Sequence, residues 1–256
     1  MPRKSAKILD GLEVNLRFLK EIGVEEFDVP AKKKTVYAPY APQGGADGAA
    51  KPGAAKSTAE FAVKSAPADP SVLEELRRTI LACRLCGLAQ GRTQAVPGEG
   101  DPRAELMFVG EGPGRDEDAQ GRPFVGRAGQ LLTRIIAAMG FDRSRVFIAN
   151  IVKCRPPDNR VPHRDEVESC TPHLLRQIEL IRPRIIVSLG KTATDFFLPD
   201  TTGGMTSIRG RFYDWRGIRI MPTFHPSYLI RNEGNKEIKK MVWDDMKLVM
   251  ALLAEK

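Results

Sequence analysis

The sequence lacks any long apolar run. Although 42% of its 256 residues are hydrophobic, no segment approaches the roughly 18 consecutive apolar residues that a membrane-spanning helix needs. The N-terminus, MPRKSAKILDG, is basic but has neither the apolar core nor the small-residue cleavage site of a secretory signal. We therefore expect a cytoplasmic protein with no membrane partner.

Complete phosphate-binding loops are also missing. In GEGPGR (110–115), Arg115 stands where the motif G-x-G-x-x-G requires its last glycine. In the segment that ends in LGKT, Ile185 stands where the first glycine of a P-loop belongs. We therefore interpret Lys191 and Thr192 as an ordinary helix start and do not expect a nucleotide-phosphate site.

Cysteine is scarce, and the four in the chain are Cys83, Cys86, Cys154 and Cys170. Two disulfides would be unusual in a cytoplasmic protein. A thioredoxin-like pair would lie between a strand and a helix, whereas Cys83 and Cys86 follow a predicted helix. A metal site with four thiolates is the favoured interpretation. Zinc sites usually contain two close cysteine pairs and this chain has one, so the spacing leaves zinc and an iron–sulfur cluster equally open.

The chain is basic, with a net charge of +8 and a pI near 9.4. Residues 1–70 contain 11 Lys and Arg against 9 Asp and Glu, which leaves 29 against 23 for the rest of the chain. The basic character therefore belongs mainly to the later part. It favours a polyanionic partner, with nucleic acid ahead of an acidic membrane surface.

Composition divides the chain near residue 70. Apolar residues recur at helical spacing over residues 8–22, which predicts a short amphipathic helix. The segment after it is rich in Ala, Pro, Gly and Lys and is typical of a flexible tether. We expect an N-terminal extension (1–70), whose helix binds a protein partner or another copy of the chain, and a folded domain (71–256).

Strand and helix patterns alternate in this domain. It opens with a capping-box pattern at Ser71 and Glu74. Apolar runs predict four strands, at 104–110, 146–152, 184–190 and 218–224. Helical patterns lie at about 127–139, 164–181, 191–198 and 236–253. This alternation predicts an α/β fold with a parallel sheet covered by helices on both faces, whose ligands bind at the carboxyl ends of the strands.

Side chains suited to a planar heterocycle follow three of these strands. Glu111 and Glu117 flank the glycines after the first strand, and Phe124 follows a turn. Asn150 is a polar residue within the second apolar run, where burial needs a reason. His225 directly follows the fourth strand. A phenyl ring can stack on a base, an amide can bond its edge and an imidazole can stabilise charge on a carbonyl oxygen, so the set fits a nucleobase flipped out of DNA.

Three motifs carry a resemblance to a known family. They are GEGPGRDEDAQGRPFVGRAGQLL, FIANIVKCRPPDNRVP and TFHPSYLIRN. Together with the four cysteines, they resemble family 4 uracil-DNA glycosylases, the iron–sulfur branch of the superfamily, over about residues 75–252. The resemblance implies a three-layer α/β/α fold around a four-stranded parallel sheet and a [4Fe–4S] cluster. The implied activity is hydrolysis of the N-glycosidic bond of uracil in single- or double-stranded DNA, which leaves an abasic site.

The resemblance also implies roles for residues of the substrate pocket. Phe124 would stack on the extruded uracil, and Asn150 would bind its Watson–Crick edge. His225 would bond uracil O2, where negative charge grows as the glycosidic bond breaks. The cluster ligands would be Cys83, Cys86, Cys154 and Cys170.

Gly112 is expected in the same pocket, at a position where another branch of the superfamily keeps an aspartate that positions water. Glu111 and Glu117 are then the carboxylates available for catalysis, and Glu117 lies where the pocket should exclude a thymine methyl group. Because the aspartate is absent, we expect stabilisation of the departing uracil anion to matter more than a general base.

The segment SYLIRN, after the histidine, is expected to contact DNA. Leu229 would wedge into the minor groove and Arg231 would bind a phosphate, with Ser227 beside them. Four polar residues close to the motifs are expected on the solvent-exposed surface. They are Asp116, Asp118, His163 and His173.

Two alternative functions stay open at this point. One is a glycosylase of the same fold that acts on another deaminated base. The other is a non-catalytic iron–sulfur protein that binds DNA. The second would keep the basic charge and the cysteines, but it would not need Phe124, Asn150 and His225 together.

Overall fold

The computed structural model describes residues 69–255. The helix predicted over residues 8–22, the tether after it and their expected partner lie outside the described residues, so the division near residue 70 stays a prediction. Within the described part of the chain, no helix is both long enough and apolar enough to cross a membrane.

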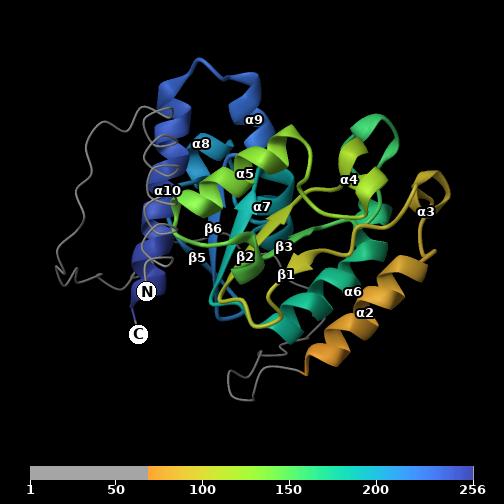
Figure 1. The fold of residues 1–256 in the computed structure, drawn as a ribbon. Coiled ribbons are helices and arrows are strands. Elements are labelled where there is room, and N and C mark those ends of the chain that lie inside the picture. The colour runs from red at the N-terminus through yellow and green to blue at the C-terminus, as the bar shows by residue number, and fades with distance from the viewer. Residues whose placement is uncertain (1–68, 256) are drawn as a thin grey trace, which may run out of the picture.

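A six-stranded mixed sheet forms the centre of the described chain (Figure 1). Its strands, in spatial order, are β1 (Glu99–Gly100), β3 (Phe147–Asn150), β2 (Leu106–Gly110), β4 (Ile185–Leu189), β6 (Ile218–Thr223) and β5 (Tyr213–Trp215). The four middle strands are parallel, and each edge strand is antiparallel to its neighbour. The predicted α/β fold and its four parallel strands are confirmed, but the sheet has two further strands. These edges have two and three residues, which is too short for a period to show in the sequence.

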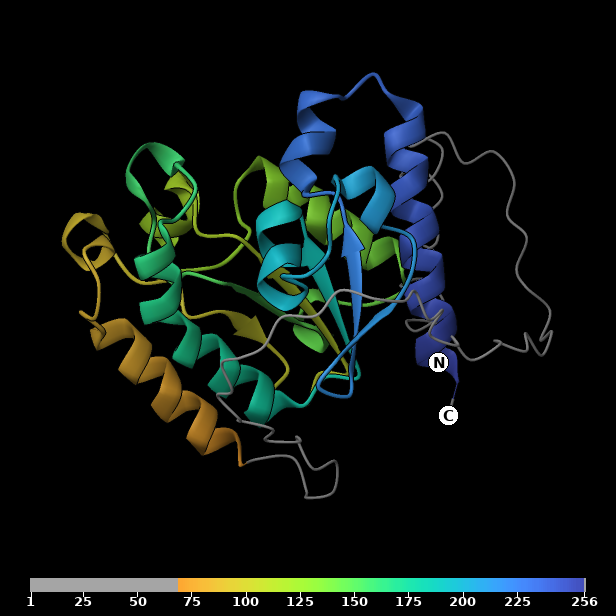
Figure 2. The ribbon, with the colours of Figure 1, turned by 180° about the vertical axis from the view of Figure 1, so that it is seen from behind.

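Helices cover both faces of the sheet and form the expected three layers (Figure 1 and Figure 2). One face carries α5 (Arg127–Ala138), α8 (Met205–Ile208), α9 (Pro226–Arg231) and α10 (Lys236–Ala254). The other face carries α2 (Pro70–Ala82), α6 (Arg164–Ile181) and α7 (Lys191–Phe197). Short elements lie in the connections: α3 (Leu88–Gly91), α4 (Arg115–Gln120), and the 3-10 turns η1 (Arg143–Arg145) and η2 (Pro157–Asn159).

Alternate residues of the middle strands face opposite layers. Leu106 and Phe108 join the core beneath α5 and α10, whereas Met107 and Val109 join the core beneath α6 and α7. All five residues of β2 are buried. Because helices cover both faces, the strand is apolar throughout its core positions instead of alternating between polar and apolar residues.

The start of α2 differs from the expected capping box. Asp69 caps the helix by accepting a hydrogen bond from the Ser71 backbone N–H at 2.9 Å, and Pro70 occupies the first turn. Glu74 instead pairs with Arg77 on the surface at 3.3 Å. The Ser71–Glu74 box was therefore a wrong prediction, because proline suits the first helical position and the cap precedes it.

A buried ion pair joins α10 to the segment before β5. Asp245 is fully buried and accepts hydrogen bonds from Arg209 Nε at 2.9 Å and from Thr223 Oγ1 at 2.6 Å. Burial raises the pKa of Asp245 to about 6, so the carboxylate is ionised at pH 7. Since Thr223 is the last residue of β6, the pair also fixes the strand end from which the chain leads to His225.

Asp245→Ala should lower the free energy of unfolding by about 3–5 kcal/mol, because it leaves the guanidinium of Arg209, whose side chain is only 13% exposed, without its carboxylate partner. The matched control is Asp244→Ala, in the preceding position of the same helix, where the carboxylate pairs with Lys247 on the surface. Removing this exposed pair should cost at most about 1 kcal/mol. Urea unfolding of both variants measures the two changes in the free energy of unfolding. Equal changes would show that the buried pair stabilises the fold no more than the surface pair does.

Candidate active site

A pocket of about 550 Å³ opens at the carboxyl edge of the sheet. The loops that follow β2, β3, β4 and β6 all reach it, as in other open α/β sheets, where ligands bind beyond the strand ends. The residues predicted to act on the substrate all line this pocket: Glu111, Gly112, Glu117, Phe124, Asn150 and His225. From the segment predicted to contact DNA, Ser227 and Arg231 line it as well.

Asn150 ends β3 and is buried, with 2% of its surface exposed. Parallel pairing sets it beside Gly110, the last residue of β2. Its Oδ1 atom is buried and has no hydrogen-bond partner among the described residues. An unpaired buried oxygen costs about 1–3 kcal/mol, so this atom favours a ligand or a water molecule that donates a hydrogen bond to it from the pocket.

The Phe124 ring approaches Asn150 closely. A Cβ atom on Gly110 would lie 2.5 Å from Phe124 Cζ and 2.6 Å from Asn150 Oδ1. Any side chain at position 110 would therefore clash with both, and glycine is what lets the ring and the amide meet. The centroid of the Phe124 ring also lies 5.7 Å from that of His225, with the two planes tilted by 35°.

His225 begins α9 as its N-cap residue. Its Nδ1 atom accepts a hydrogen bond from the Ser227 backbone N–H at 3.1 Å and lies 2.7 Å from the Ser227 hydroxyl oxygen. Burial, together with the charge of Arg231, lowers the pKa of His225 to about 4. The imidazole is therefore neutral at pH 7, and because Nδ1 accepts, its proton is on Nε2. The pocket thus contains a neutral N–H donor.

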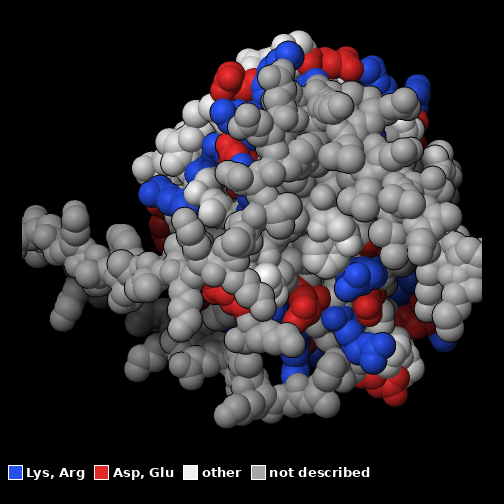
Figure 3. Space-filling view, turned by 60° about the vertical axis from the view of Figure 1, so that its left-hand side comes forward, with Lys and Arg blue, Asp and Glu red and all other residues white. Residues whose placement is uncertain are grey.

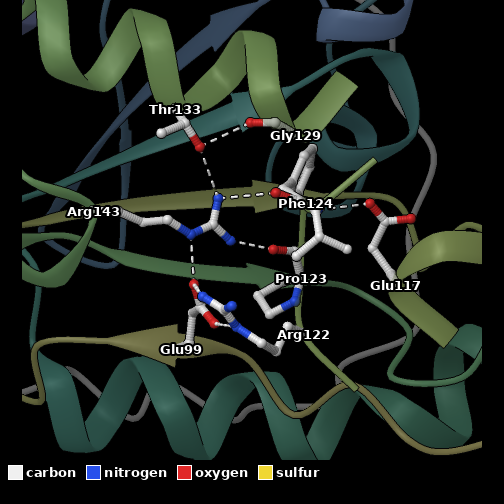
Figure 4. A network of polar contacts seen from close by, with 9 residues as sticks. Glu99, Glu117, Arg122, Pro123, Phe124, Gly129, Thr133 and Arg143 are labelled. Atoms are coloured by element: carbon white, nitrogen blue, oxygen red, sulfur yellow. Dashed lines mark hydrogen bonds and ion pairs between the residues drawn. The ribbon is translucent and has the colours of Figure 1, made fainter. Parts of the chain in front are cut away.

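The carboxylate of Glu117 is bound to backbone amides. Its Oε1 atom accepts hydrogen bonds from the N–H groups of Val125 and Gly126, each at 2.9 Å, and its Oε2 atom accepts one from Gly114 at 3.1 Å. Figure 4 shows this carboxylate directed toward the loop that carries Phe124. Glu117 therefore orders the pocket wall, in addition to lining it.

Glu111 is hydrogen-bonded to Thr192, a residue that the sequence analysis did not assign to the pocket. Its Oε2 atom accepts a hydrogen bond from Thr192 Oγ1 at 2.5 Å. Thr192 and Lys191 form the first turn of α7, as expected, but both also line the pocket. The signal that could have identified them is their position directly after β4, at the edge where the other site residues lie.

Gly112 lies against the loop that follows β3. A Cβ atom there would lie 2.8 Å from Val152 Cγ2, so a side chain would displace its neighbour. Glycine at position 112 therefore lets the loop that follows Glu111 pack closely against the Val152 side chain, in the segment after Asn150.

Leu229 does not lie where its predicted role requires. Its side chain is 4% exposed and belongs to the core under α5. The prediction of a minor-groove wedge at this residue was therefore wrong, because SYLIRN forms helix α9 and this turn of the helix directs Leu229 inward. The exposed apolar side chains in this region are Tyr228, at 37%, and Val161, at 59%, and Val161 lines the pocket.

Basic side chains surround the mouth of the pocket. Three line the pocket itself and three line an adjoining hollow: Arg160, Lys191 and Arg231, then Arg115, Arg127 and Arg155. Acidic partners are present too, since Arg160 pairs with Glu166 at 2.6 Å and Asp116 lies 3.7 Å from Arg115. Figure 3, which turns forward the side that lies on the left in Figure 1, shows basic and acidic side chains of the described residues close together there as well. The basic side chains around the mouth suit a polyanion that enters there.

All four cysteines line a second, smaller cavity. They come from the end of α2, the segment just after it, the loop after β3, and α6. Within residues 69–255, no three His, Cys, Asp or Glu side chains are grouped closely enough to hold a single metal ion. Four cysteines around one cavity are the ligand set that either a zinc ion or an iron–sulfur cluster uses.

Polar groups are directed at the sulfur atoms of this cavity. Arg92 Nη1 donates to Cys154 Sγ at 3.0 Å, and the Lys153 backbone N–H donates to Cys170 Sγ at 3.2 Å. Burial raises the pKa of the Cys154 thiol, and it raises that of Cys170 to about 11. Thiolates at these positions would therefore need the positive charge of a bound metal as well as the N–H donors.

Two residues predicted on the surface are buried. His173 is 7% exposed, and its Nε2 atom lies 3.2 Å from Cys83 Sγ. Asp118 is 4% exposed and accepts hydrogen bonds from the Thr93 backbone N–H at 3.0 and 3.1 Å. Both predictions were wrong because partners far away in the sequence supply these contacts. His163 is exposed, as predicted.

Comparison with known proteins identifies relatives over most of the described chain. Residues 97–247 match the family model described as the uracil DNA glycosylase superfamily. The type-4 uracil-DNA glycosylase of Sulfurisphaera tokodaii is 45% identical over 188 residues, which cover 70% of this chain and 84% of that protein. That of Thermotoga maritima is 47% identical over 176 residues, 68% of this chain and 91% of that protein. A type-5 uracil-DNA glycosylase of Pyrobaculum aerophilum is 32% identical over 163 residues, 57% of this chain and 71% of that protein.

The His225 imidazole should remain neutral well below the ordinary histidine pKa of about 6.5 and titrate near pH 4, because burial disfavours its charged form. Long-range ¹H–¹⁵N NMR spectra should show the proton on Nε2. The chain has three histidines, so the signals that disappear in His225→Gln identify this ring. A ring protonated on Nδ1, or a midpoint at the ordinary value, would contradict the geometry described above.

Proposed function

The chain belongs to the uracil DNA glycosylase superfamily, and we propose that the pocket at the carboxyl edge of its sheet excises uracil from DNA. The protein is a glycosylase, a hydrolase of N-glycosidic bonds that acts in DNA repair. The observation that carries the assignment of the pocket is the unpaired, buried Oδ1 atom of Asn150. A flipped uracil offers a donor for this oxygen, a face for the Phe124 ring and a carbonyl oxygen for the His225 N–H.

Asn150 would select uracil by its hydrogen-bonding edge. Uracil presents N3–H as a donor and O4 as an acceptor, which match the Oδ1 acceptor and the Nδ2 donor of an amide. Cytosine presents an acceptor at N3 and an amino group at C4, so both contacts would fail. A site built around buried polar groups rejects such an analogue strongly, because those groups are then left unpaired.

His225 would act on the leaving group. As the N-glycosidic bond breaks, its electron pair passes into uracil, and negative charge grows on O2. The neutral Nε2–H can donate to that oxygen with no prior loss of a proton. A donor placed where charge develops contributes more in the transition state than in the ground state, which is what accelerates the reaction.

Water completes the reaction by adding to C1′ of the sugar, and its proton is released. Glu111 is the better of the two carboxylates for orienting this water, because Glu117 already accepts three backbone N–H groups. Arg231, exposed at the pocket mouth, and the neighbouring arginines would bind phosphates of the DNA. Ser227 would contribute mainly by holding the His225 ring.

We also propose that Cys83, Cys86, Cys154 and Cys170 hold a [4Fe–4S] cluster. Their placement around one cavity supports this choice, with N–H groups directed at two of the sulfur atoms and a ring nitrogen of His173 beside a third. When bound, the cluster would supply iron–thiolate bonds that join α2 and the segment after it to the β3 loop and α6. Its contribution is therefore assigned to holding these segments together.

His225→Ala should raise the activation free energy of uracil release by about 2.7–4 kcal/mol, the value of one oxyanion-type donor. Affinity for DNA should change little, because the donor acts on charge present mainly in the transition state. Single-turnover cleavage of an oligonucleotide with one uracil, followed by alkaline scission of abasic sites, measures the rate. His163→Ala, an exposed histidine outside the pocket, is the matched control and should retain the rate.

The same assay tests the substrate assignment with oligonucleotides that carry cytosine, thymine or hypoxanthine in place of uracil. Excision of hypoxanthine without excision of uracil would overturn uracil as the substrate. Binding of DNA without release of any base would make the protein a DNA-binding protein. Equal losses of affinity and rate in His225→Ala would make this histidine a binding residue.

Protein purified without oxygen should contain iron and sulfide and absorb broadly in the visible range, and a chelator should remove this absorbance. Cys154→Ser should lower both the iron content and the free energy of unfolding, because one of four thiolates is lost. Ser169→Ala changes another residue that lines the same cavity and should retain the iron. Colourless protein with one zinc ion per chain would overturn the cluster.

A further inference from the structure

Phe124 has a backbone conformation that an aromatic residue rarely adopts. Its φ angle is +51°, in the left-handed region. Such a conformation is disfavoured for a bulky side chain and persists only where the surrounding structure imposes it. The polar contacts of residues 123–126 show which groups do so (Figure 4).

Arg143 binds the carbonyl groups on both sides of the Phe124 Cα atom. Its Nη1 atom donates to the Phe124 carbonyl at 2.9 Å, and its Nη2 atom donates to the Pro123 carbonyl. The Pro123 carbonyl belongs to the peptide before Phe124 Cα, and the Phe124 carbonyl belongs to the peptide after it. Fixing the orientation of both peptides fixes φ and ψ of Phe124, and with them the direction of the Cα–Cβ bond that carries its ring.

The negative charge of Glu117 holds the same loop through its backbone N–H groups. Glu117 accepts the N–H groups of Val125 and Gly126, the two residues that follow Phe124. A cation therefore binds the carbonyls of this loop, and an anion binds its amides. Gly129 brings α5 against the same backbone, because a Cβ atom there would lie 1.9 Å from the Phe124 carbonyl carbon.

Glu99 holds Arg143 in turn. Its Oε1 atom accepts a hydrogen bond from Arg143 Nε at 2.5 Å, and its Oε2 atom accepts one from Arg122 Nε at 2.8 Å. Burial opposes the charge on Glu99, but the two arginines outweigh it and lower its pKa below the ordinary value. Glu99 lies in β1 and pairs with Ile148 of β3. The loop of Phe124 is thereby tied to the strand that ends at Asn150.

We propose that Arg143, held by Glu99, is a positioning residue that sets the Phe124 ring for stacking on the extruded base. The inference rests on the proposed function of the pocket. Arg143 is not one of the residues that line the pocket, and 17% of its side chain is exposed. Arg143 would therefore affect the base only indirectly, through the position of the Phe124 ring.

Arg143→Met removes the charge and all of the donors but keeps an unbranched chain. We expect kcat/KM on a uracil-containing oligonucleotide to fall about 5- to 150-fold, the range for loss of one stacking contact. Arg143→Lys keeps the charge without the planar fork and should show a smaller loss. The matched control is Arg145→Met in the same 3-10 turn. The Arg145 guanidinium lies over the ring of Phe141 and, within the described chain, forms no hydrogen bond with the loop of Phe124. This variant should stay within about twofold of the wild type.

A double-mutant cycle distinguishes positioning from general stability. If Arg143 acts through the ring, Arg143→Met should have almost no further effect on kcat/KM in a Phe124→Ala background. Multiplied losses in the double variant would overturn the proposal. Arg143→Lys in the same background gives the cycle a second, milder variant should Arg143→Met fail to fold.

A readout that does not need catalysis completes the test. The chain has 11 phenylalanines, and in ¹H–¹³C spectra of phenylalanine-labelled protein the ring signal lost in Phe124→Ala identifies Phe124. This signal should move in Arg143→Lys and Arg143→Met but not in Arg145→Met. A wild-type protein that does not excise uracil would overturn the proposed function, whereas an unmoved Phe124 signal in the Arg143 variants would overturn the positioning role whatever the activity.

Discussion

The close approach of the Phe124 ring and the Asn150 amide over Gly110 is the constraint on which the pocket depends. Parallel pairing of β2 with β3 places Gly110 beside Asn150. The missing side chain at Gly110 then provides the space in which the ring and the amide meet. Once the ring lies there, its loop has to turn through a conformation that is disfavoured for phenylalanine. The hydrogen bonds of the surrounding charged residues stabilise that turn.

Charged side chains order the loop that carries Phe124, while the three groups proposed to contact the base are neutral. Glu117 and Arg143 bind opposite backbone groups of one loop, and Glu99 binds Arg143. The pocket itself presents an amide, a phenyl ring and an imidazole that burial keeps uncharged. This separation suits the proposed reaction, in which a neutral His225 N–H would stabilise the developing uracil anion. The fixed charges hold the loop that carries the Phe124 ring, and Ser227 holds the His225 ring.

One buried residue, Lys153, forms hydrogen bonds both to the strand end at the pocket and to a cysteine of the second cavity. Lys153 is 1% exposed, and its Nζ atom donates to the Asn150 carbonyl and to Gln177 Oε1, each at 2.7 Å. Its backbone N–H donates to Cys170 Sγ at 3.2 Å. The strand end that carries the amide is thus continuous with the segment that contains Cys154. The proposed cross-link at the cysteines and the position of Asn150 therefore depend on the same short stretch of backbone.

The sequence alone determined the four parallel strands, because burial on both faces produces uninterrupted apolar runs such as LMFVG. It also determined the pocket residues, because polar groups such as Asn150 and His225 stand at the ends of those runs. Tertiary structure decided what depends on partners distant in the chain. It buried Leu229 and His173, brought Thr192 to Glu111 and Arg143 to Phe124, and made His225 neutral. Periodicity encodes which face of an element is buried, but it does not encode which side chain from another segment will meet that face.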